Sequence, residues 1–194
     1  MKKIGFLGLG VMGLSMALNV SKKIGVEVIG YDVSETQLHR YREMGGTVAA
    51  SAEELYSTCD VLLQMLPTHA IIQHSVEEAI RLGRPGNIIV DLSSAAPDII
   101  LDLNKKAMNA GMFLLDSPVS GGNPMAEAGT LSIMTGGDPQ AFEKVKPVLE
   151  CMGTPVYTGG SGSGDTTKLI NNMVGGAILV AIAVNEDGYR EVLG

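Results

Sequence analysis

The chain has 194 residues, with 21 Asp or Glu against 14 Lys or Arg, so its formal net charge is −7. It contains no basic run or stripe, which argues against nucleic acid and anionic membrane surfaces as partners. Cys59 and Cys151 lie outside any CxxC pattern, and His69 and His74 are off the i,i+4 spacing of a helical metal pair. We therefore expect no disulfide framework and no metal site, and we interpret both histidines as structural. Because no secretory h-region follows the first lysines, we expect a cytoplasmic protein.

The chain begins with an apolar run that leads into a glycine loop, IGFLGLGVMG over residues 4–13. Gly8, Gly10 and Gly13 match GxGxxG, and residues 11–20 place apolar side chains at helical spacing. In this pattern the first glycine permits a tight turn, the second admits a pyrophosphate, and the third lets the helix pack closely on its strand. The residues expected to hold the phosphates are Gly8, Leu9, Gly10, Val11, Met12 and Gly13.

A second apolar run, residues 26–31, ends at Asp32, about 20 residues beyond the glycines. A carboxylate at this place accepts hydrogen bonds from the adenosine ribose hydroxyls. Alternatively, Asp32 is a loop residue, or it caps a helix that starts at Ser34. Strand, glycines, helix, strand and carboxylate in this order favour a dinucleotide site. An acid here would also repel a 2′-phosphate, so the sequence favours NAD over NADP as cofactor.

The remainder of the chain alternates between short apolar runs and segments with helical periodicity. The expected helices cover residues 34–44, a short segment from 51, 69–82, 97–110 and 138–149. The expected strands cover residues 60–66, 87–92, 113–115, 131–135 and 155–158. This order predicts an α/β fold of the Rossmann type, a doubly wound, mainly parallel sheet with helices on both faces. Ligands of such sheets bind beyond the carboxyl ends of the strands.

Two of these strand ends carry candidate cofactor residues. Leu66 and Pro67 follow the strand at 60–66, and Ser94 follows the strand at 87–92. We expect the two loops to border the nicotinamide half of the cofactor, where Ser94 has a hydroxyl for a hydrogen bond. The alternative is that Thr68 and Ser93 or Ser94 only cap the following helices.

Two later segments carry candidate substrate residues. In DSPVSGG, Ser120, Gly121 and Gly122 offer a hydroxyl and consecutive amides that suit a carboxylate, although an ordinary glycine turn has the same composition. After a glycine-rich entry that would admit a ligand, Lys168 and Asn172 stand at i,i+4 on one helix face. Without further context, we would interpret Lys168 as a surface lysine.

Residues 173–184 are all apolar or glycine. The stretch is too short to span a membrane and is typical of a helix buried on every side. One Rossmann unit cannot cover it, so we expect cover from sequence outside this chain or from a second subunit. A homo-oligomer, dimer or tetramer, follows from this expectation.

Taken together, the motifs resemble the β-hydroxyacid dehydrogenase family, which includes 3-hydroxyisobutyrate dehydrogenase and tartronate semialdehyde reductase. The resemblance spans essentially the whole chain. The blocks that carry it are GFLGLGVMGLSMALN, MLPT, DLSSAAP, DSPVSGG, GTLSIMTGG and GSGSGDTTKLINN.

The resemblance implies hydride transfer between NAD(P) and a small 3-hydroxy acid or its semialdehyde. It implies that Lys168 is the catalytic acid and base, that Asn172 positions the substrate, and that residues 120–122 hold the substrate carboxylate. It also implies an NAD-binding domain over residues 1–161 and, over residues 162–194, the first helix of an all-α domain that continues beyond this chain. The segment DGYRE at residues 187–191 fits that helix poorly.

Two alternatives stay open. The first is an enzyme similar to 6-phosphogluconate dehydrogenase, which shares the fold, the serine-glycine-glycine loop and the lysine. In that enzyme a histidine usually precedes the asparagine, whereas Asn171 precedes Asn172 here. The second is a dinucleotide-binding or oligomerisation module without catalytic activity, against which Lys168 and Asn172 argue.

Overall fold

The computed structural model describes residues 1–182, and the side chains of residues 1–175. The elements of the amino-terminal half are β1 (Lys3–Leu7), α1 (Val11–Lys23), β2 (Glu27–Tyr31), α2 (Glu35–Glu43), β3 (Thr47–Val48), α3 (Ala52–Thr58), β4 (Val61–Gln64), α4 (His69–Leu82) and β5 (Ile88–Asp91). The remaining elements are α5 (Pro97–Asn109), β6 (Phe113–Asp116), β7 (Val119–Ser120), α6 (Gly122–Ala128), β8 (Leu131–Gly136), α7 (Pro139–Glu150), β9 (Gly153–Gly159) and α8 (Ser163–Ile182).

The strands form one sheet in the order β3-β2-β1-β4-β5-β6-β8-β7, with β9 paired to β8. The first six strands of this order are parallel and reproduce the Rossmann order 3-2-1-4-5-6. Beyond them, β8 runs antiparallel to β6 and β7, and β9 runs parallel to β8. The prediction of a doubly wound, mainly parallel α/β sheet is confirmed.

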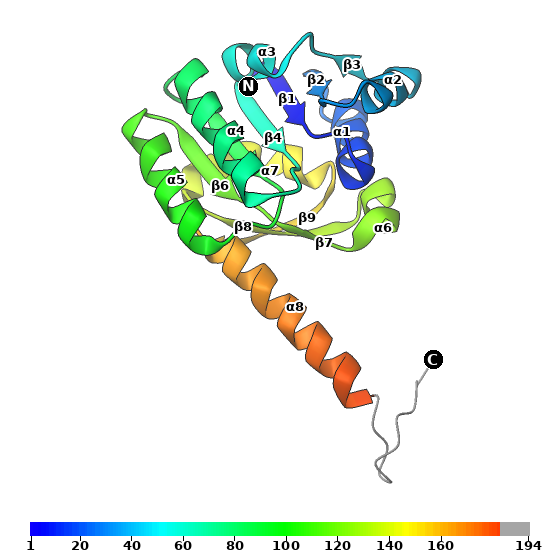
Figure 1. Ribbon diagram of the computed structural model, residues 1–194, viewed down its shortest axis with the longest axis vertical. Coiled ribbons are helices and arrows are strands. Elements are labelled where there is room, and N and C mark those ends of the chain that lie inside the picture. The colour runs from blue at the N-terminus through cyan, green and yellow to red at the C-terminus, as the bar shows by residue number, and fades with distance from the viewer. Residues whose placement is uncertain (183–194) are drawn as a thin grey trace.

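Alternate residues of the buried strands face two separate hydrophobic cores, as the period of two in a strand requires. On β5, Ile88 and Val90 join the core formed with α1, α2, α6 and α7, whereas Ile89 joins the core formed with α3, α4 and α5. Figure 1 shows α4 and α5 on the near side of the sheet and α7 on the far side. Both faces are therefore covered, which explains why the strands read as continuous apolar runs.

Three elements were missing from the sequence-based prediction. The strands β3 and β7 have two residues each, too few for a visible alternation of polar and apolar positions. The helix α6 begins at Gly122, directly after Gly121, and both glycines have positive φ, 137° at Gly121 and 69° at Gly122. A glycine pair of this kind is typical of a turn, and here it is a turn that starts a helix.

The helix α8 leads away from the sheet (Figure 1). Met173 and Val174 are 65% and 52% exposed, so the described residues of this chain leave the start of the apolar stretch uncovered. Among the helices of residues 1–182, none combines the length and hydropathy of a membrane span. Residues 183 and 184 of the predicted apolar helix, and the segment at 187–191, lie outside the described residues.

Candidate functional site

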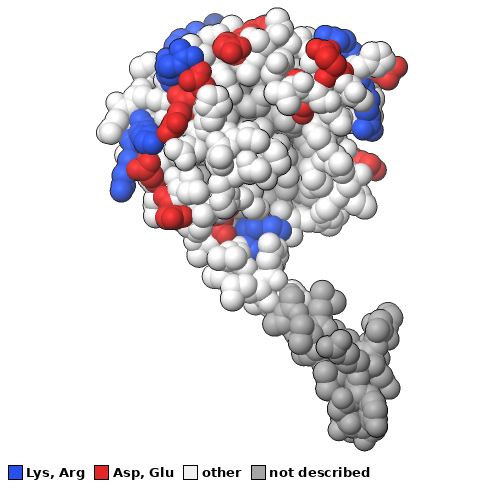
Figure 2. Space-filling model, in the orientation of Figure 1, with Lys and Arg blue, Asp and Glu red and all other residues white. Residues whose placement is uncertain are grey.

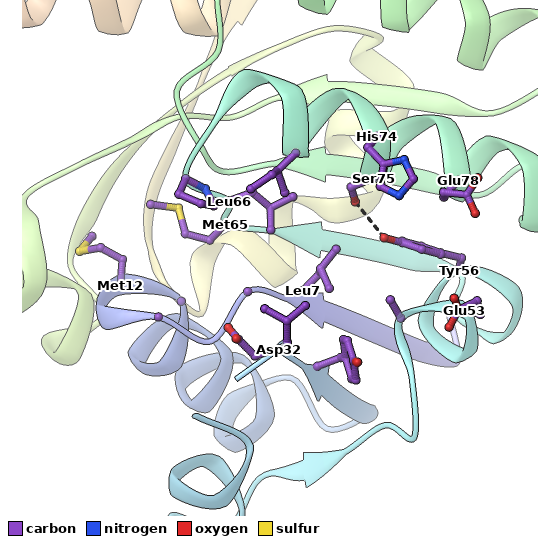
Figure 3. Close-up of a pocket in the computed structure, with 18 of the residues that line it drawn as sticks. Leu7, Met12, Asp32, Glu53, Tyr56, Met65, Leu66, His74, Ser75 and Glu78 are labelled. Atoms are coloured by element: carbon purple, nitrogen blue, oxygen red, sulfur yellow. Dashed lines mark hydrogen bonds between the residues drawn. The ribbon is translucent and has the colours of Figure 1, made fainter. Parts of the chain in front are cut away.

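A pocket of about 660 Å³ opens at the carboxyl ends of β1, β2 and β4, where the strand order reverses (Figure 3). A crevice at this switch point is where doubly wound sheets bind their ligands. Of the predicted cofactor residues, those that line the pocket are Gly8, Gly10, Val11, Met12, Gly13, Asp32, Leu66 and Pro67.

The three glycines of the loop meet different surroundings. Gly8 has φ +90°, and a Cβ there would overlap the carbonyl oxygen of Met65. A Cβ on Gly13 would overlap the carbonyl oxygen of Gly8, so the absence of a side chain lets α1 pack against the loop. By contrast, a Cβ on Gly10 would meet no atom within 4 Å. Two glycines are thus required by the fold, and the third leaves open space in which a ligand fits.

The amino end of α1 is prepared for an anion. Gly10 occupies the N-cap position and offers no side-chain cap, and no acidic residue lies in the first turn. The first amides of a helix have no partner within the helix and carry a partial positive charge. The open space beside Gly10 therefore fits a phosphate group of a dinucleotide.

Asp32 is half-buried at the end of β2 and is held by the backbone. Its Oδ2 accepts a hydrogen bond from the Leu9 N–H at 2.7 Å, and its Oδ1 accepts one from the Ser34 N–H at 2.8 Å. Each carboxylate oxygen retains a lone pair for a further donor such as a ribose hydroxyl. Leu9 itself is fully buried and does not line the pocket, so its contribution is this bond to Asp32.

The loops after β4 and β5 are tied to each other. Ser93 Oγ accepts a hydrogen bond from the Leu66 N–H at 2.8 Å. Thr68 Oγ1 accepts from the Ile71 N–H at 3.3 Å and therefore caps α4, as the alternative interpretation stated. The N-cap position of α5 is Ala96, so neither Ser93 nor Ser94 caps that helix. Ser94 is exposed and lies outside the lining of the pocket.

The other end of the pocket contains residues that the sequence did not single out. Tyr56 and Ser75 share a hydrogen bond of 3.2 Å there, with His74 and Glu78 beside them (Figure 3). His74, which the sequence indicates to be structural, has an exposed side chain that borders the pocket. These residues belong to α3 and α4, and only the packing of α3 against α4 and β1 brings them into one pocket with Asp32.

The charges of the residues that line the pocket indicate which dinucleotide it suits. Asp32, Glu53 and Glu78 are among the lining residues, whereas no Lys or Arg in the described part of the chain lines the pocket. A 2′-phosphate is usually accommodated by a nearby arginine, so this lining suits NAD better than NADP.

On the face shown in Figure 2, basic and acidic side chains are interspersed, and no basic stripe crosses it.

The predicted carboxylate loop is joined to the cofactor helix. Ser120 lies in β7, and Gly121 and Gly122 lead into α6. The Asn19 side chain of α1 donates hydrogen bonds to the carbonyl oxygens of Ala126 at 2.8 Å and Glu127 at 3.2 Å, near the carboxyl end of α6. The helix behind the glycine loop thus holds α6, the helix that begins at Gly122.

The last glycine of the glycine-rich entry to α8 is required by packing, whereas a Cβ on Gly160 would meet no atom within 4 Å. A Cβ on Gly164 would overlap the carbonyl oxygens of Asp116 and Met134, so this glycine brings the helix against β6 and β8 rather than admitting a ligand. The Asp116 carboxylate accepts hydrogen bonds from the Gly162 N–H at 2.9 Å and from the Asp165 N–H at 3.0 Å. Asp116 therefore caps α8 from the end of β6, where a negative charge is favourable.

Lys168 and Asn172 lie on the helix that Asp116 caps. Lys168 is half-buried, and burial lowers the pKa of its amine from the usual 10.5. Asn172, one turn further, is exposed in this chain. Asp165 Oδ1 accepts a hydrogen bond from the Ala95 N–H at 3.0 Å, which joins the first turn of α8 to the residue after Ser94. The structure thus connects the Lys168 helix to the loop after β5, although neither Lys168 nor Asn172 lines the pocket.

Three polar side chains in register form a row that sequence reasoning missed. Gln64, Asp91 and Asp116 are the last residues of β4, β5 and β6, they are paired across the strands, and all are at most 1% exposed. Gln64 Nε2 donates to Asp91 Oδ1 at 3.3 Å, and the Ser93 N–H donates to the same oxygen at 3.2 Å. Burial raises the pKa of Asp91 to about 6 and also raises that of Asp116. The signal in the sequence is a polar residue that ends each of three apolar runs.

The strand order, the glycine loop and the pocket at the switch point define a dinucleotide-binding domain of the Rossmann class. Residues 3–160 match the family model described as the NAD binding domain of 6-phosphogluconate dehydrogenase. The chain belongs to this family of NAD-binding domains and, with the relatives below, to the β-hydroxyacid dehydrogenases.

Three relatives show the extent of the similarity. The chain is 36% identical to 2-(hydroxymethyl)glutarate dehydrogenase of Eubacterium barkeri, over 93% of this chain and 61% of the relative. It is 40% identical to the mitochondrial 3-hydroxyisobutyrate dehydrogenase of Drosophila melanogaster, over 89% of this chain and 54% of the relative. The solved structure of Mycobacterium tuberculosis 3-hydroxyisobutyrate dehydrogenase with L-serine superimposes with a TM-score of 0.89 at 35% identity, covering 94% of this chain and 63% of that one. The chain thus spans a little over half of the length of these relatives.

Proposed function

We propose that the protein containing this chain is an NAD-dependent oxidoreductase that acts on a small 3-hydroxy acid or its semialdehyde, of the 3-hydroxyisobutyrate or tartronate semialdehyde and glycerate type. The observation that carries the proposal is that Asp116 attaches α8, the helix of Lys168, to the carboxyl end of β6. The pocket beside the glycine loop opens at the same edge of the sheet. The names of the relatives support the substrate class.

The residues have distinct roles in this proposal. Bound NAD supplies a hydride acceptor at nicotinamide C4. Lys168 takes the proton of the substrate hydroxyl in oxidation and returns it in reduction. Burial favours the neutral amine that a base requires, because it disfavours the charged form. Asn172 positions the substrate, and Ser120 with the amides of Gly121 and Gly122 holds its carboxylate.

We further propose the arrangement of the whole protein. Residues 1–161 form the NAD-binding domain, and residues 162–194 begin the first helix of an all-α domain. The exposed apolar side chains of α8 support this division, because Leu169, Ile170 and Met173 are each more than half exposed. A homo-oligomer, a small carboxylate substrate and a cytoplasmic location complete the proposal.

An absorbance assay of NADH and NADPH formation tests the substrate class. The substrates are 3-hydroxyisobutyrate, glycerate, 3-hydroxypropionate and 6-phosphogluconate, offered to this chain and to the longest natural polypeptide that contains it. We expect NADH formation with a small 3-hydroxy acid. Turnover of 6-phosphogluconate alone would favour the second candidate, which the description of the family model supports.

A calorimetric titration with NAD separates the enzyme from a binding module. Binding with no turnover of any substrate by the longer polypeptide would identify the non-catalytic module instead. Absence of NAD binding would contradict both interpretations, since both require the pocket beside Gly10.

A further inference from the structure

We propose that Asp165 is a positioning residue for Lys168. Its carboxylate joins the first turn of α8 to the loop after β5, and so fixes where the lysine lies relative to that loop. The inference rests on the proposed role of Lys168, and it gives a role to a residue that is not among the site residues predicted from the sequence.

The first step is the place of Asp165 in the helix. It lies one turn before Lys168 and is 4% exposed. Its side chain reaches across to the Ala95 N–H, and its own N–H donates to Asp116 Oδ2. Asp165 therefore contacts two different strand ends, β5 through the loop that follows it and β6 directly.

The second step is that the loop on the other side of this bond is itself fixed. Asp91 Oδ1 accepts from the Ser93 N–H, and Ser93 Oγ accepts from the Leu66 N–H in the lining of the pocket. Short hydrogen-bonded segments thus lead from Leu66 to Ser93, and Ala95 lies two residues beyond Ser93. Among the described residues, the hydrogen bond from the Ala95 N–H to the Asp165 side chain is the side-chain contact that attaches α8 to this loop.

The third step is the cost of the arrangement. Asp165 Oδ2 and Asp91 Oδ2 are buried and have no hydrogen-bond partner within the described residues. Asp165 also faces the like charges of Asp91 and Asp116. An apolar side chain would avoid this cost but would leave the Ala95 N–H without its acceptor. The bond from the Ala95 N–H supports the role of acceptor for this carboxylate.

The test compares two substitutions with opposite expectations. Asp165→Asn keeps an acceptor for the Ala95 N–H and removes the charge, whereas Asp165→Leu keeps the branching at Cγ, is larger, and removes both. As a matched control, Asp138→Leu removes the carboxylate that caps α7 through the Ala141 N–H at 2.8 Å. Lys168 is observed by NMR in protein labelled with [ε-¹³C]lysine, and its resonance is assigned with Lys168→Arg.

The pKa of Lys168 distinguishes positioning from a simple charge effect. Removing a nearby carboxylate lowers a lysine pKa, and both Asp165 variants would then act alike. Loss of positioning instead exposes the amine to water and raises its pKa. We expect Asp165→Leu to raise the pKa of Lys168 by about 0.5 or more and to speed hydrogen exchange at Ala95, with Asp165→Asn and Asp138→Leu close to wild type. An equal or downward change in both Asp165 variants, or a rise in the control, overturns the proposal.

Turnover gives the second readout. In the longer polypeptide we expect Asp165→Leu to lower kcat about tenfold while the KM for NAD changes less than about threefold, and Asp165→Asn to restore kcat. A fall of kcat no larger than that of Asp138→Leu would refute positioning. If the wild type turns over no 3-hydroxy acid, the proposed function fails, but the NMR and exchange results still decide whether Asp165 positions Lys168.

Discussion

Asp32 at the end of β2 and Leu9 in the glycine loop are joined by a hydrogen bond of 2.7 Å from the Leu9 N–H to the Asp32 carboxylate. The acid that the sequence assigns to the ribose therefore also holds the loop that we propose faces the phosphates. Two effects of its removal are separable, because asparagine keeps one oxygen that can accept from the Leu9 N–H, at the expense of the bond from the Ser34 N–H, and alanine keeps neither.

We expect Asp32→Asn to weaken NAD binding about tenfold through loss of a charged acceptor, and to narrow the preference for NAD over NADP. Asp32→Ala should weaken NAD binding further, since the glycine loop also loses the hydrogen bond from the Leu9 N–H to residue 32. Calorimetric titration of both variants with NAD and NADP measures these changes. An unchanged ratio of the two affinities in Asp32→Asn would mean that the carboxylate does not select the cofactor.

The glycines of the loop provide a matched pair of substitutions. Gly13→Ala places a Cβ against the carbonyl oxygen of Gly8 and should lower Tm by several degrees. Gly10 has φ −65° and open space around it, so Gly10→Ala should keep Tm within about 3 °C but weaken NAD binding about tenfold or more. Thermal unfolding and NAD titration of both variants separate a packing role from a binding role. Normal NAD affinity in Gly10→Ala would mean that the phosphates lie elsewhere.

Lys168→Ala should leave NAD affinity within about twofold and lower turnover about 10²-fold or more, because the reaction loses its acid and base. The measurement is steady-state turnover of the longer polypeptide on whichever 3-hydroxy acid it accepts, with calorimetry for NAD. Lys105→Ala, an exposed lysine on α5, is the control. Near-normal turnover of Lys168→Ala would exclude this lysine from the chemistry.

Burial raises the pKa of Asp165 from 3.8 to about 7, and the nearby charges of Asp116 and Asp91 add to the rise, while the bond from the Ala95 N–H opposes it. Between pH 4 and 7 the folded protein therefore binds more protons at this site than the unfolded chain, so the contribution of Asp165 to the free energy of unfolding falls as the pH rises. Asp165→Asn should flatten the dependence of stability on pH. At pH values above 7 it should raise Tm by about 2 °C or more. Thermal unfolding of both proteins at several pH values provides the comparison, and parallel curves would show that Asp165 does not titrate in this range.

The sequence predicted the parts of the fold whose signals are local. The helix at 69–82 has the bounds of α4, and the glycine spacing located the loop beside the pocket. Partnerships between distant segments were out of reach. Asp165 and Ala95 are brought together only when α8 packs on β6, and the row of Gln64, Asp91 and Asp116 exists only through strand register. Short strands such as β3 and β7 have too few residues to show the alternation of polar and apolar positions that identifies a strand.

The amide of Asn19 spans two helices that belong to different halves of the sheet, since α1 follows β1 and α6 precedes β8. A chimera that takes its first βαβ unit from another dinucleotide-binding protein would lose this connection unless the donor has an asparagine at the equivalent helix position. Exchange of cofactor preference by grafting of this unit should therefore include Asn19, so that the connection to α6 is kept.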